Sequence, residues 1–263
     1  MYAVSGAGGA PSQLYTVNPL TGATTLVGAI GFSHVTGLAI DPTSGQMYGC
    51  VSDIFGTGDV QLISINKNTG AGTLIGNTGH QIPDMSFRSD GQLFGWSEMD
   101  PSETFVDVLV SINKFTGAAT PIGTSTLGTA NTGFGASPNG TLLLKNFDLS
   151  MHSVNPITGE TTFLTTLSGD GFSLHNILLM QTDTQGFSVG RRAGTSFLYN
   201  IDLNTSTYTE IGDMGVSNIS ALALDIAPIP EPGTLVLLGL AGTGTVMVIK
   251  KRRGKRRSKK AKK

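Results

Sequence analysis

The stretch Leu62-Ile-Ser-Ile-Asn-Lys-Asn-Thr-Gly70 is one of five similar copies in this 263-residue chain. The other copies are Leu14-Tyr-Thr-Val-Asn-Pro-Leu-Thr-Gly22, Leu109-Val-Ser-Ile-Asn-Lys-Phe-Thr-Gly117, Met151-His-Ser-Val-Asn-Pro-Ile-Thr-Gly159 and Leu198-Tyr-Asn-Ile-Asp-Leu-Asn-Thr-Ser206. The Asn or Asp of each copy stands at position 18, 66, 113, 155 or 202, which gives steps of 48, 47, 42 and 47 residues. A repeat of this length indicates an array of similar structural units.

Each copy predicts a β-strand that leads into a hairpin turn. The residues before the Asn alternate in character, as in a strand. The Asn-x-x-Thr-Gly ending offers a side chain that can bond its own backbone, followed by a residue that tolerates positive φ. A second strand follows the turn: Thr25–Gly28, Thr73–Gly76, Thr120–Gly123, Thr209–Gly212 and, in divergent form, Thr162–Thr165.

Two more strands are expected in each interval between copies. The first is small and apolar, as in Thr36–Asp41 and Ser220–Asp225, and the next follows a turn, as in Gln46–Gly49, Gln92–Gly95 and Gly186–Val189. Four short strands per 42–48 residues are typical of a β-propeller blade. The small strand is expected to be innermost, because blades converge on the axis.

The two ends of the repeat region fit together as one blade. Met1–Ser5 resembles a second strand, and the last inner strand, within 219–225, has no outer strands after it. The prediction is therefore an all-β propeller over 1–226 with five four-stranded blades, closed by pairing of the N- and C-terminal strands. The alternative is an upstream start with six or more blades. Met1–Ala10 does not resemble an N-terminal export signal. An upstream start would supply one.

Composition agrees with a turn-rich β protein, since 13% of residues are charged and 36 are Gly. The single cysteine, Cys50, excludes an internal disulfide framework and a multi-cysteine metal site. Eleven of the 17 Lys and Arg residues lie in 250–263, so the preceding 249 residues carry a net charge of −12. An acidic body of this kind argues against nucleic acid as a partner.

The C-terminal region has three parts in order. A linker over 227–233 contains Pro230-Glu231-Pro232, an uncharged stretch of 16 residues covers 234–249, and a basic tail covers 250–263. As a helix the stretch would be roughly 24 Å long, against about 30 Å of hydrocarbon. We expect a transmembrane helix with a cytoplasmic basic tail, which places residues 1–230 outside the cytoplasm. A permanent single-span anchor and a basic tail on a soluble protein are the alternatives.

This ordered set resembles the PEP-CTERM sorting signal of Gram-negative bacteria, over about residues 228–263. The resemblance implies that Pro230, Glu231 and Pro232 form the recognition motif of an exosortase-type processing peptidase. It also implies cleavage near that motif, after transit through the inner membrane. The expected destination of the propeller is the cell surface or the extracellular medium.

No catalytic motif is found, so the sequence predicts no enzyme, no cofactor and no metal site. Asp53-Ile-Phe-Gly-Thr-Gly-Asp59 could hold calcium, although an ordinary hairpin loop is favoured. His34, His80 and His175 each precede an inner strand and could ring one mouth of the channel, where they would bind a metal or an anion. The plainer interpretation is three exposed loop residues. Arg191-Arg192, the one basic pair of the body, is expected on a solvated loop.

Two functions remain open. The first is a non-catalytic binding or structural module of the surface or matrix, which contacts extracellular polysaccharide or surface proteins. The second is an extracellular polysaccharide hydrolase or lyase, because the fold alone does not decide function. Two carboxylates about 5–10 Å apart at the channel mouth would favour the hydrolase.

Overall fold

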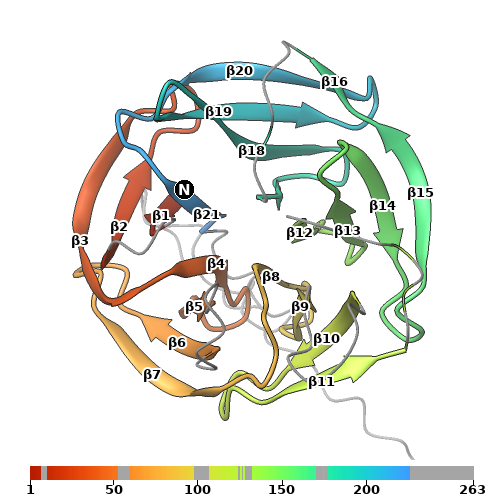
Figure 1. Cartoon of the computed structure of the whole chain (residues 1–263), viewed down its shortest axis with the longest axis horizontal. Helices are drawn as coiled ribbons and strands as arrows, with labels where there is room; N and C mark the ends of the chain where they lie inside the picture. The colour runs from red at the N-terminus through yellow and green to blue at the C-terminus, as the bar shows by residue number, and fades with distance from the viewer. Residues whose placement is uncertain are drawn as a thin grey trace, which may run out of the picture. The chain divides into compact units, whose positions relative to one another are not determined.

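The computed structural model describes residues 1–6, 11–52, 60–97, 107–123, 125, 127, 132–169, 174 and 177–225. These residues form strands arranged in five sheets around a central axis, with no helix among them (Figure 1). The prediction of a five-bladed all-β propeller is confirmed. Within the described residues no helix is long and apolar enough to cross a membrane.

The sheets follow one another around the ring as blades I to V. Blade I contains β21 (Ile219–Ala223), β1 (Tyr2–Ser5), β2 (Pro11–Val17) and β3 (Thr24–Ser33). Blade II contains β4 (Val35–Ile40), β5 (Met47–Val51), β6 (Gln61–Ile65) and β7 (Gly72–Asn77). Blade III contains β8 (Asp84–Phe87), β9 (Leu93–Ser97), β10 (Val108–Ile112) and β11 (Ala119–Ile122).

The remaining two blades complete the circle. Blade IV contains β12 (Gly133–Ala136), β13 (Leu142–Lys145), β14 (Ser150–Val154) and β15 (Thr161–Thr166). Blade V contains β17 (Leu179–Met180), β18 (Gln185–Arg192), β19 (Thr195–Asp202) and β20 (Thr207–Asp213). The short strand β16 (Ser168–Gly169) adds to β20 in parallel, a feature that the repeat pattern does not predict.

Blade I closes the ring with strands from both ends of the repeat region. β1 pairs antiparallel with β21, with Ala3 opposite Leu222 and Val4 opposite Ala221, as the sequence predicts. The Ser220 hydroxyl donates to the carbonyl oxygens of Val35 at 2.6 Å and Val4 at 3.1 Å. This side chain therefore joins the closing strand to both of its neighbours.

The hydrophobic core lies between blades. It consists of five clusters of buried side chains, and each cluster draws its members from two blades that are neighbours in the ring. The cluster between blades V and I includes Leu198, Met214 and Leu222, so closure buries apolar surface as well as pairing strands. Burial between neighbours makes each blade depend on the next.

At the outer rim, the Thr-Gly turns of blades I to IV each pack against the outermost strand of the blade before them. A Cβ added to Gly76 of β7 would lie 2.1 Å from the carbonyl oxygen of Thr116, in the turn of blade III. Glycines 28, 123 and 212 meet the turns of blades II, IV and I in the same way. These close contacts explain why the repeat has a glycine in the outermost strand and another at the end of the turn.

The interface between blades IV and V has a different contact. Thr165 stands at the strand position where the other blades have Gly, and Ser206 stands at the turn position. The two hydroxyl groups lie 2.6 Å apart and form a hydrogen bond. The two departures from the repeat are therefore partners, and a polar contact takes the place of the glycine contact.

The chain divides into two compact units, Met1–Ile229 and Pro230–Lys263. The first contains all the described residues. The linker with Pro230-Glu231-Pro232, the predicted transmembrane helix at 234–249 and the basic tail at 250–263 lie outside the described residues.

Candidate functional site

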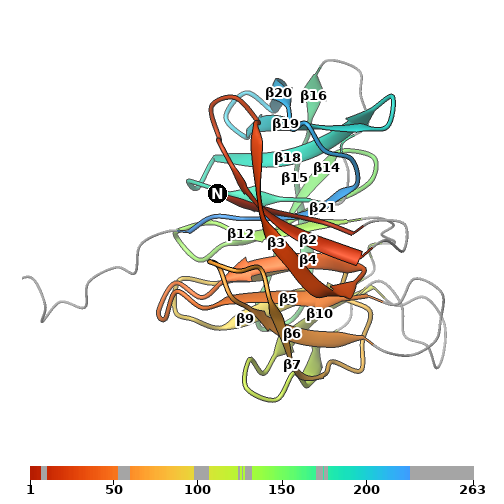
Figure 2. The ribbon, with the colours of Figure 1, turned by 90° about the vertical axis from the view of Figure 1, so that its left-hand side faces the viewer.

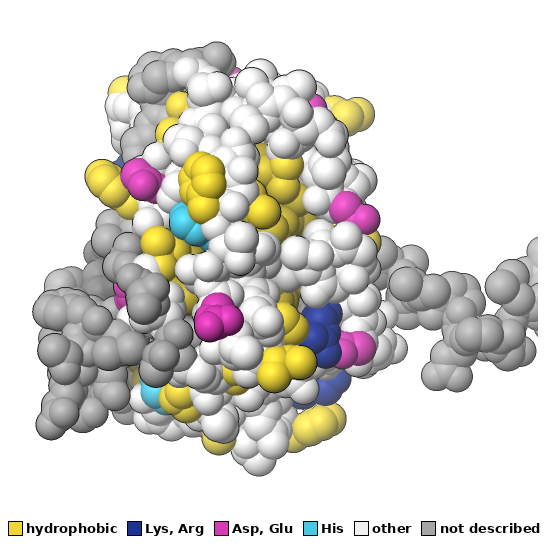
Figure 3. Space-filling model, turned by 90° about the vertical axis from the view of Figure 1, so that its right-hand side faces the viewer, with side chains coloured by type: hydrophobic (Ala, Val, Ile, Leu, Met, Phe, Trp, Pro, Cys, Tyr) yellow, Lys and Arg dark blue, Asp and Glu magenta, His cyan; other side chains and the backbone are white. Residues whose placement is uncertain are grey.

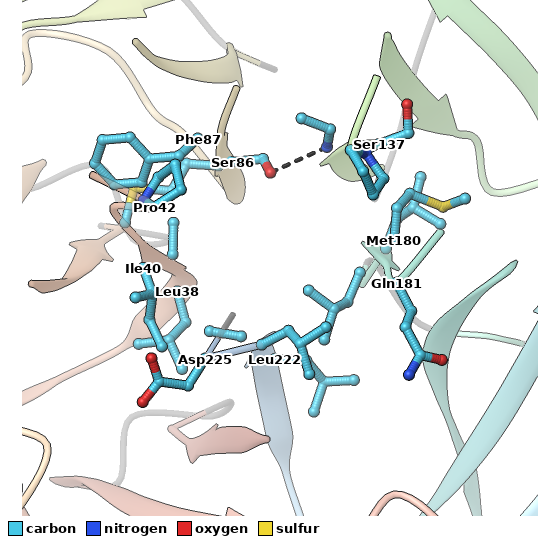
Figure 4. A pocket seen from close by; sticks show the side chains of 18 of the residues that line it. Leu38, Ile40, Pro42, Ser86, Phe87, Ser137, Met180, Gln181, Leu222 and Asp225 are labelled. Atoms are coloured by element: carbon cyan, nitrogen blue, oxygen red, sulfur yellow. Dashed lines mark hydrogen bonds between the residues drawn. The ribbon is translucent and has the colours of Figure 1, made fainter. Parts of the chain in front are cut away.

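A cavity lies on the propeller axis between the C-terminal ends of the five inner strands. Its volume is about 460 Å³, within the usual range of ligand pockets. We call it the axial cup. Figure 4 shows Leu38, Ile40, Phe87, Met180 and Leu222 around the open space. The lining is mainly apolar, with Ser86, Ser89, Ser137, Gln181 and Asp225 as its polar side chains.

Small residues allow the inner strands to come close enough to form this cup. A Cβ added to Gly133 of β12 would lie 2.7 Å from the backbone of Ile177, and one added to Gly37 would lie 3.3 Å from Met85. Alanine occupies the equivalent position in β21, at Ala221. Blades III and V depart from this pattern, because they carry Asp84 and Ile177 at that position.

Asp84 connects three blades below the cup. Its Oδ2 atom accepts hydrogen bonds from the backbone N–H groups of Phe134 at 3.0 Å and Leu178 at 3.3 Å, while Oδ1 accepts from Met85 at 2.9 Å. Inner strands have one unpaired edge, and a buried N–H without a partner is costly. Asp84 therefore satisfies edge groups of blades IV and V that no strand can reach.

Two titratable groups are buried in the same region. Burial raises the pKa of Asp84, and the three N–H donors and the charge of Lys145 only partly oppose this shift. Burial lowers the pKa of Lys145 to about 8, against the opposing charge of Asp84. Burial also raises the pKa of the Cys50 thiol, whose sulfur lies 3.3 Å from that of Met85. The sulfur is thus a packed core atom in its protonated form.

The carboxylates at the cup mouth are ion-paired. Asp225 accepts from Lys67 Nζ at 2.9 Å, and Asp41, which begins the turn after β4, accepts from Lys114 Nζ at 2.7 Å. Lys67 and Lys114 occupy the same repeat position, so each lysine reaches from its own turn to the inner strand of the blade before it. Both carboxylates thus have cationic partners.

A further hydrogen bond fixes the rim between blades III and IV. The Ser86 hydroxyl accepts from the backbone N–H of Ala136 at 3.0 Å, as the dashed line in Figure 4 marks. The free edges of the inner strands are thus satisfied by side chains both at the rim and below it. The cup is consequently a preformed cavity.

The predicted histidines lie away from the cup. His34 directly precedes β4 and has a φ of 54°, and His80 precedes β8 with its Nδ1 atom buried and without a hydrogen-bond partner. Both stand at the N-terminal ends of inner strands, whereas the cup lies at the C-terminal ends. His175, Asp53 and Asp59 lie outside the described residues. Within the described ranges, no group of three His, Cys, Asp or Glu residues could hold a metal ion.

The expected loop position of Arg191-Arg192 is wrong. The two arginines end β18, where each pairs across the hairpin with β19. The Arg192 guanidinium lies 3.2 Å from Glu210 and 4.1 Å from the centre of the Phe197 ring. The pair stabilises a long hairpin, which the sequence pattern did not reveal because Ala193 and Gly194 are a two-residue turn without an apolar flank.

A cluster at the outer side of blade IV was not recognised from the sequence. The Ser150 hydroxyl donates to Asp148 Oδ1 and lies 3.0 Å from His152 Nε2, and the Phe163 ring meets the imidazole edge to face at 5.6 Å. Burial lowers the pKa of His152, opposed by the charge of Asp148. The alternating pattern Asp-x-Ser-x-His would have placed the three on one strand face.

This cluster is a turn-stabilising arrangement. In a catalytic Ser-His-Asp triad the imidazole lies between the hydroxyl and the carboxylate, whereas here the hydroxyl lies between the other two. The surrounding side of the propeller carries few charged side chains, and most of them are separated by uncharged ones (Figure 3). The axial cup is therefore the stronger candidate for a binding site.

Comparison with known proteins identifies the C-terminal segment. Residues 228–253 match the PEP-CTERM protein-sorting motif, so the chain carries this signal. No curated protein matches the chain.

Solved structures give only distant likenesses. TolB from Acinetobacter baumannii is 14% identical, with a TM-score of 0.44 over 80% of this chain and 51% of its own. Puromycin hydrolase is 17% identical, with a TM-score of 0.43 over 80% of this chain and 35% of its own. The chain thus spans about half or less of these two proteins.

Proposed function

We propose that this protein is a non-catalytic binding module, exported by its sorting motif, whose axial cup holds an apolar group of its ligand. The sorting motif and the propeller indicate an exported surface protein. The observation that supports a binding role is the composition of the cup, whose polar groups lie among a majority of apolar side chains. Sites of this composition suit apolar side chains of a partner protein, because burial of apolar surface supplies the binding energy.

The alternative of a polysaccharide hydrolase needs one carboxyl group that donates a proton and a second that acts as base or nucleophile. Asp225 lines the cavity and Asp41 directly follows the lining residue Ile40, and each of these carboxylates is bound by a lysine. Burial raises the pKa of Asp41, but hydrogen bonds from Lys114, Thr43 and Ser44 outweigh burial and hold it at about 2, which is unsuited to a proton donor at neutral pH. These features favour binding over hydrolysis.

A fluorescent apolar probe tests the cup. We expect anilinonaphthalene sulfonate to bind the native protein with enhanced emission, and Ala136→Phe, which fills part of the cup, to weaken that binding at least tenfold. Ala29→Phe on the exposed face of β3 makes the same change away from the cup and should leave binding unchanged. Equal binding by the two variants, with native circular dichroism in both, would contradict the proposal.

The hydrolase is tested on the same protein. Release of reducing ends from extracellular polysaccharide by the native chain, lost in both Asp41→Asn and Asp225→Asn, would establish the enzyme instead.

A further inference from the structure

Three of the five repeat turns carry a large apolar residue at their tip. Leu20, Phe115 and Ile157 occupy the third position of the Asn-x-x-Thr-Gly turn in blades I, III and IV, and 86%, 78% and 82% of their surfaces are exposed. The equivalent tips of blades II and V carry Asn68 and Asn204. Single exposed apolar residues are common on protein surfaces, but these three share one position of the repeat and are more exposed than the other large apolar side chains of the described residues, except that Phe147 comes near them at 66%.

The turns hold these side chains in the same local geometry. The backbone N–H of Leu20, of Phe115 and of Ile157 each donates to the Oδ1 atom of the turn's own Asn, at 2.9 Å in all three cases. The glycine that ends each turn has a φ between 72° and 82°. Equivalent turns on a ring of blades present their tips at a common level, as a tripod.

The tripod lies on the same face as the mouth of the axial cup. In an antiparallel four-stranded blade, the turn between the first two strands and the turn between the last two lie at one end. The Lys67–Asp225 and Lys114–Asp41 pairs tie these two sets of turns together. Figure 2 shows the end of β21 on the side where these hairpin turns gather. We call this surface the cup face.

The polypeptide leaves the described part of the propeller from the cup face, at Asp225. Eight residues separate Asp225 from Thr234, where the uncharged stretch of the sorting region begins. A fully extended chain covers about 3.5 Å per residue, so this connector reaches roughly 30 Å at most. While the sorting segment is held in a membrane, the cup face cannot move further than this from the lipid.

The charges of the cup face are compatible with approach to lipid. Asp41, Asp90 and Asp225 are each paired with a base, which reduces the acidic character of this face. Asp183 and Glu160, in turns of the same face, accept hydrogen bonds from the Asn139 backbone and the Thr158 hydroxyl and keep part of that character. A flat partner can touch three tips at one level at the same time, whereas a small soluble ligand cannot. We infer that the cup face docks on the membrane surface, with Leu20, Phe115 and Ile157 inserted at the lipid headgroup level.

The inference is tested with the full chain in vesicles of phosphatidylethanolamine and phosphatidylglycerol, with the propeller outside. The native Trp96 is fully buried, so brominated lipids should leave its emission nearly unchanged. Phe115→Trp should gain a second emission that brominated lipids quench at least twofold. Leu74→Trp, an exposed residue of outer strand β7, is the matched control and should not be quenched.

A second variant separates docking from mere tethering. Leu20→Ser with Ile157→Ser, added to Phe115→Trp, should reduce the quenching at least twofold, because two of three inserted tips are lost. The inference is overturned if Phe115→Trp is quenched no more than the control, or if the quenching is unchanged after loss of the other two tips. It is also overturned if the tryptophan emission changes with the amount of protein per vesicle but not with bromination of the lipid. This last result would indicate a second copy as the partner.

Discussion

At the scale of single residues, two buried aspartates maintain the centre of this propeller by different means. Asp84 accepts three backbone N–H groups and joins blades III, IV and V. Asp41 is almost fully buried and accepts from Lys114 and from the Thr43 and Ser44 hydroxyls. Asp84 therefore replaces backbone pairing that the converging inner strands cannot provide, whereas Asp41 stabilises its own turn and holds the lysine of the next blade.

The environment of Asp41 predicts a loss of stability in acid. Burial raises its pKa, but hydrogen bonds from Lys114, Thr43 and Ser44 outweigh burial and bring the pKa to about 2. An unfolded Asp titrates near 3.9, so the native state binds its proton less readily. The contribution, about 2 kcal/mol, is complete above pH 5 and disappears as the pH falls from about 4 to 2.

Urea unfolding at several pH values measures this effect. Asp41→Asn should remove about 2 kcal/mol of the fall in unfolding free energy between pH 5 and pH 2. Asp90→Asn is the control, because its pair with Arg88 is half exposed and pairs of that kind contribute little. A native-like acid dependence in Asp41→Asn would show that another group is responsible.

At the scale of elements, the contact between an outer strand and the next turn is the unit that repeats. At four of the five interfaces between blades, a glycine lets the two backbones come into contact. The interface between blades IV and V uses the Thr165–Ser206 hydrogen bond instead. Propeller blades have few contacts outside their neighbours, so these positions set how closely the blades pack.

Alanine at the same repeat position should have different effects in two blades. Gly76→Ala puts a Cβ 2.1 Å from a backbone oxygen, so the blades must separate, and we expect a loss of about 3 kcal/mol. Thr165→Ala replaces a residue that already has a Cβ and loses one hydrogen bond, for about 1 kcal/mol. Thermal or urea unfolding of the two variants compares them directly, and the reverse order would refute the packing argument.

At the scale of the whole molecule, closure and sorting meet at one strand. β21 completes blade I, and the sorting motif begins only a few residues after it. The last folded strand is therefore held on two sides, by β1 and by β4 through Ser220. We expect that removal of the tail leaves the propeller intact, because the closing contacts found among the described residues precede residue 226.

Processing gives the corresponding prediction. Mass spectrometry of the mature native protein should find a C-terminus near Pro230 and no species that ends at Lys263. Glu231→Ala with Pro232→Ala should leave the full chain in the membrane fraction, because the recognition motif is lost. A mature native protein with an intact Lys263 would show that the segment is a permanent anchor.

Local patterns were sufficient for the repeat architecture. The Asn-x-x-Thr-Gly turns, the small inner strands and the split blade at the chain ends are local or periodic signals, and they predicted five blades and their closure. The sorting motif was equally clear, because its three parts are contiguous. The extra strand β16 and the strand position of Arg191-Arg192 were missed, because they follow from pairings that the repeat does not encode.

The site is a different case. The sequence directed attention to His34, His80 and His175, because similar positions suggest a ring, yet the cavity lies at the other ends of the inner strands. The sequence by itself determined the blade count, the closure and the sorting tail, since these depend on short-range patterns repeated along the chain. Only the tertiary structure decided that Asp84 bonds across three blades, that Lys67 and Lys114 neutralise the mouth, and that three turn tips form one level. Those features depend on residues far apart in sequence, which the ring alone brings together.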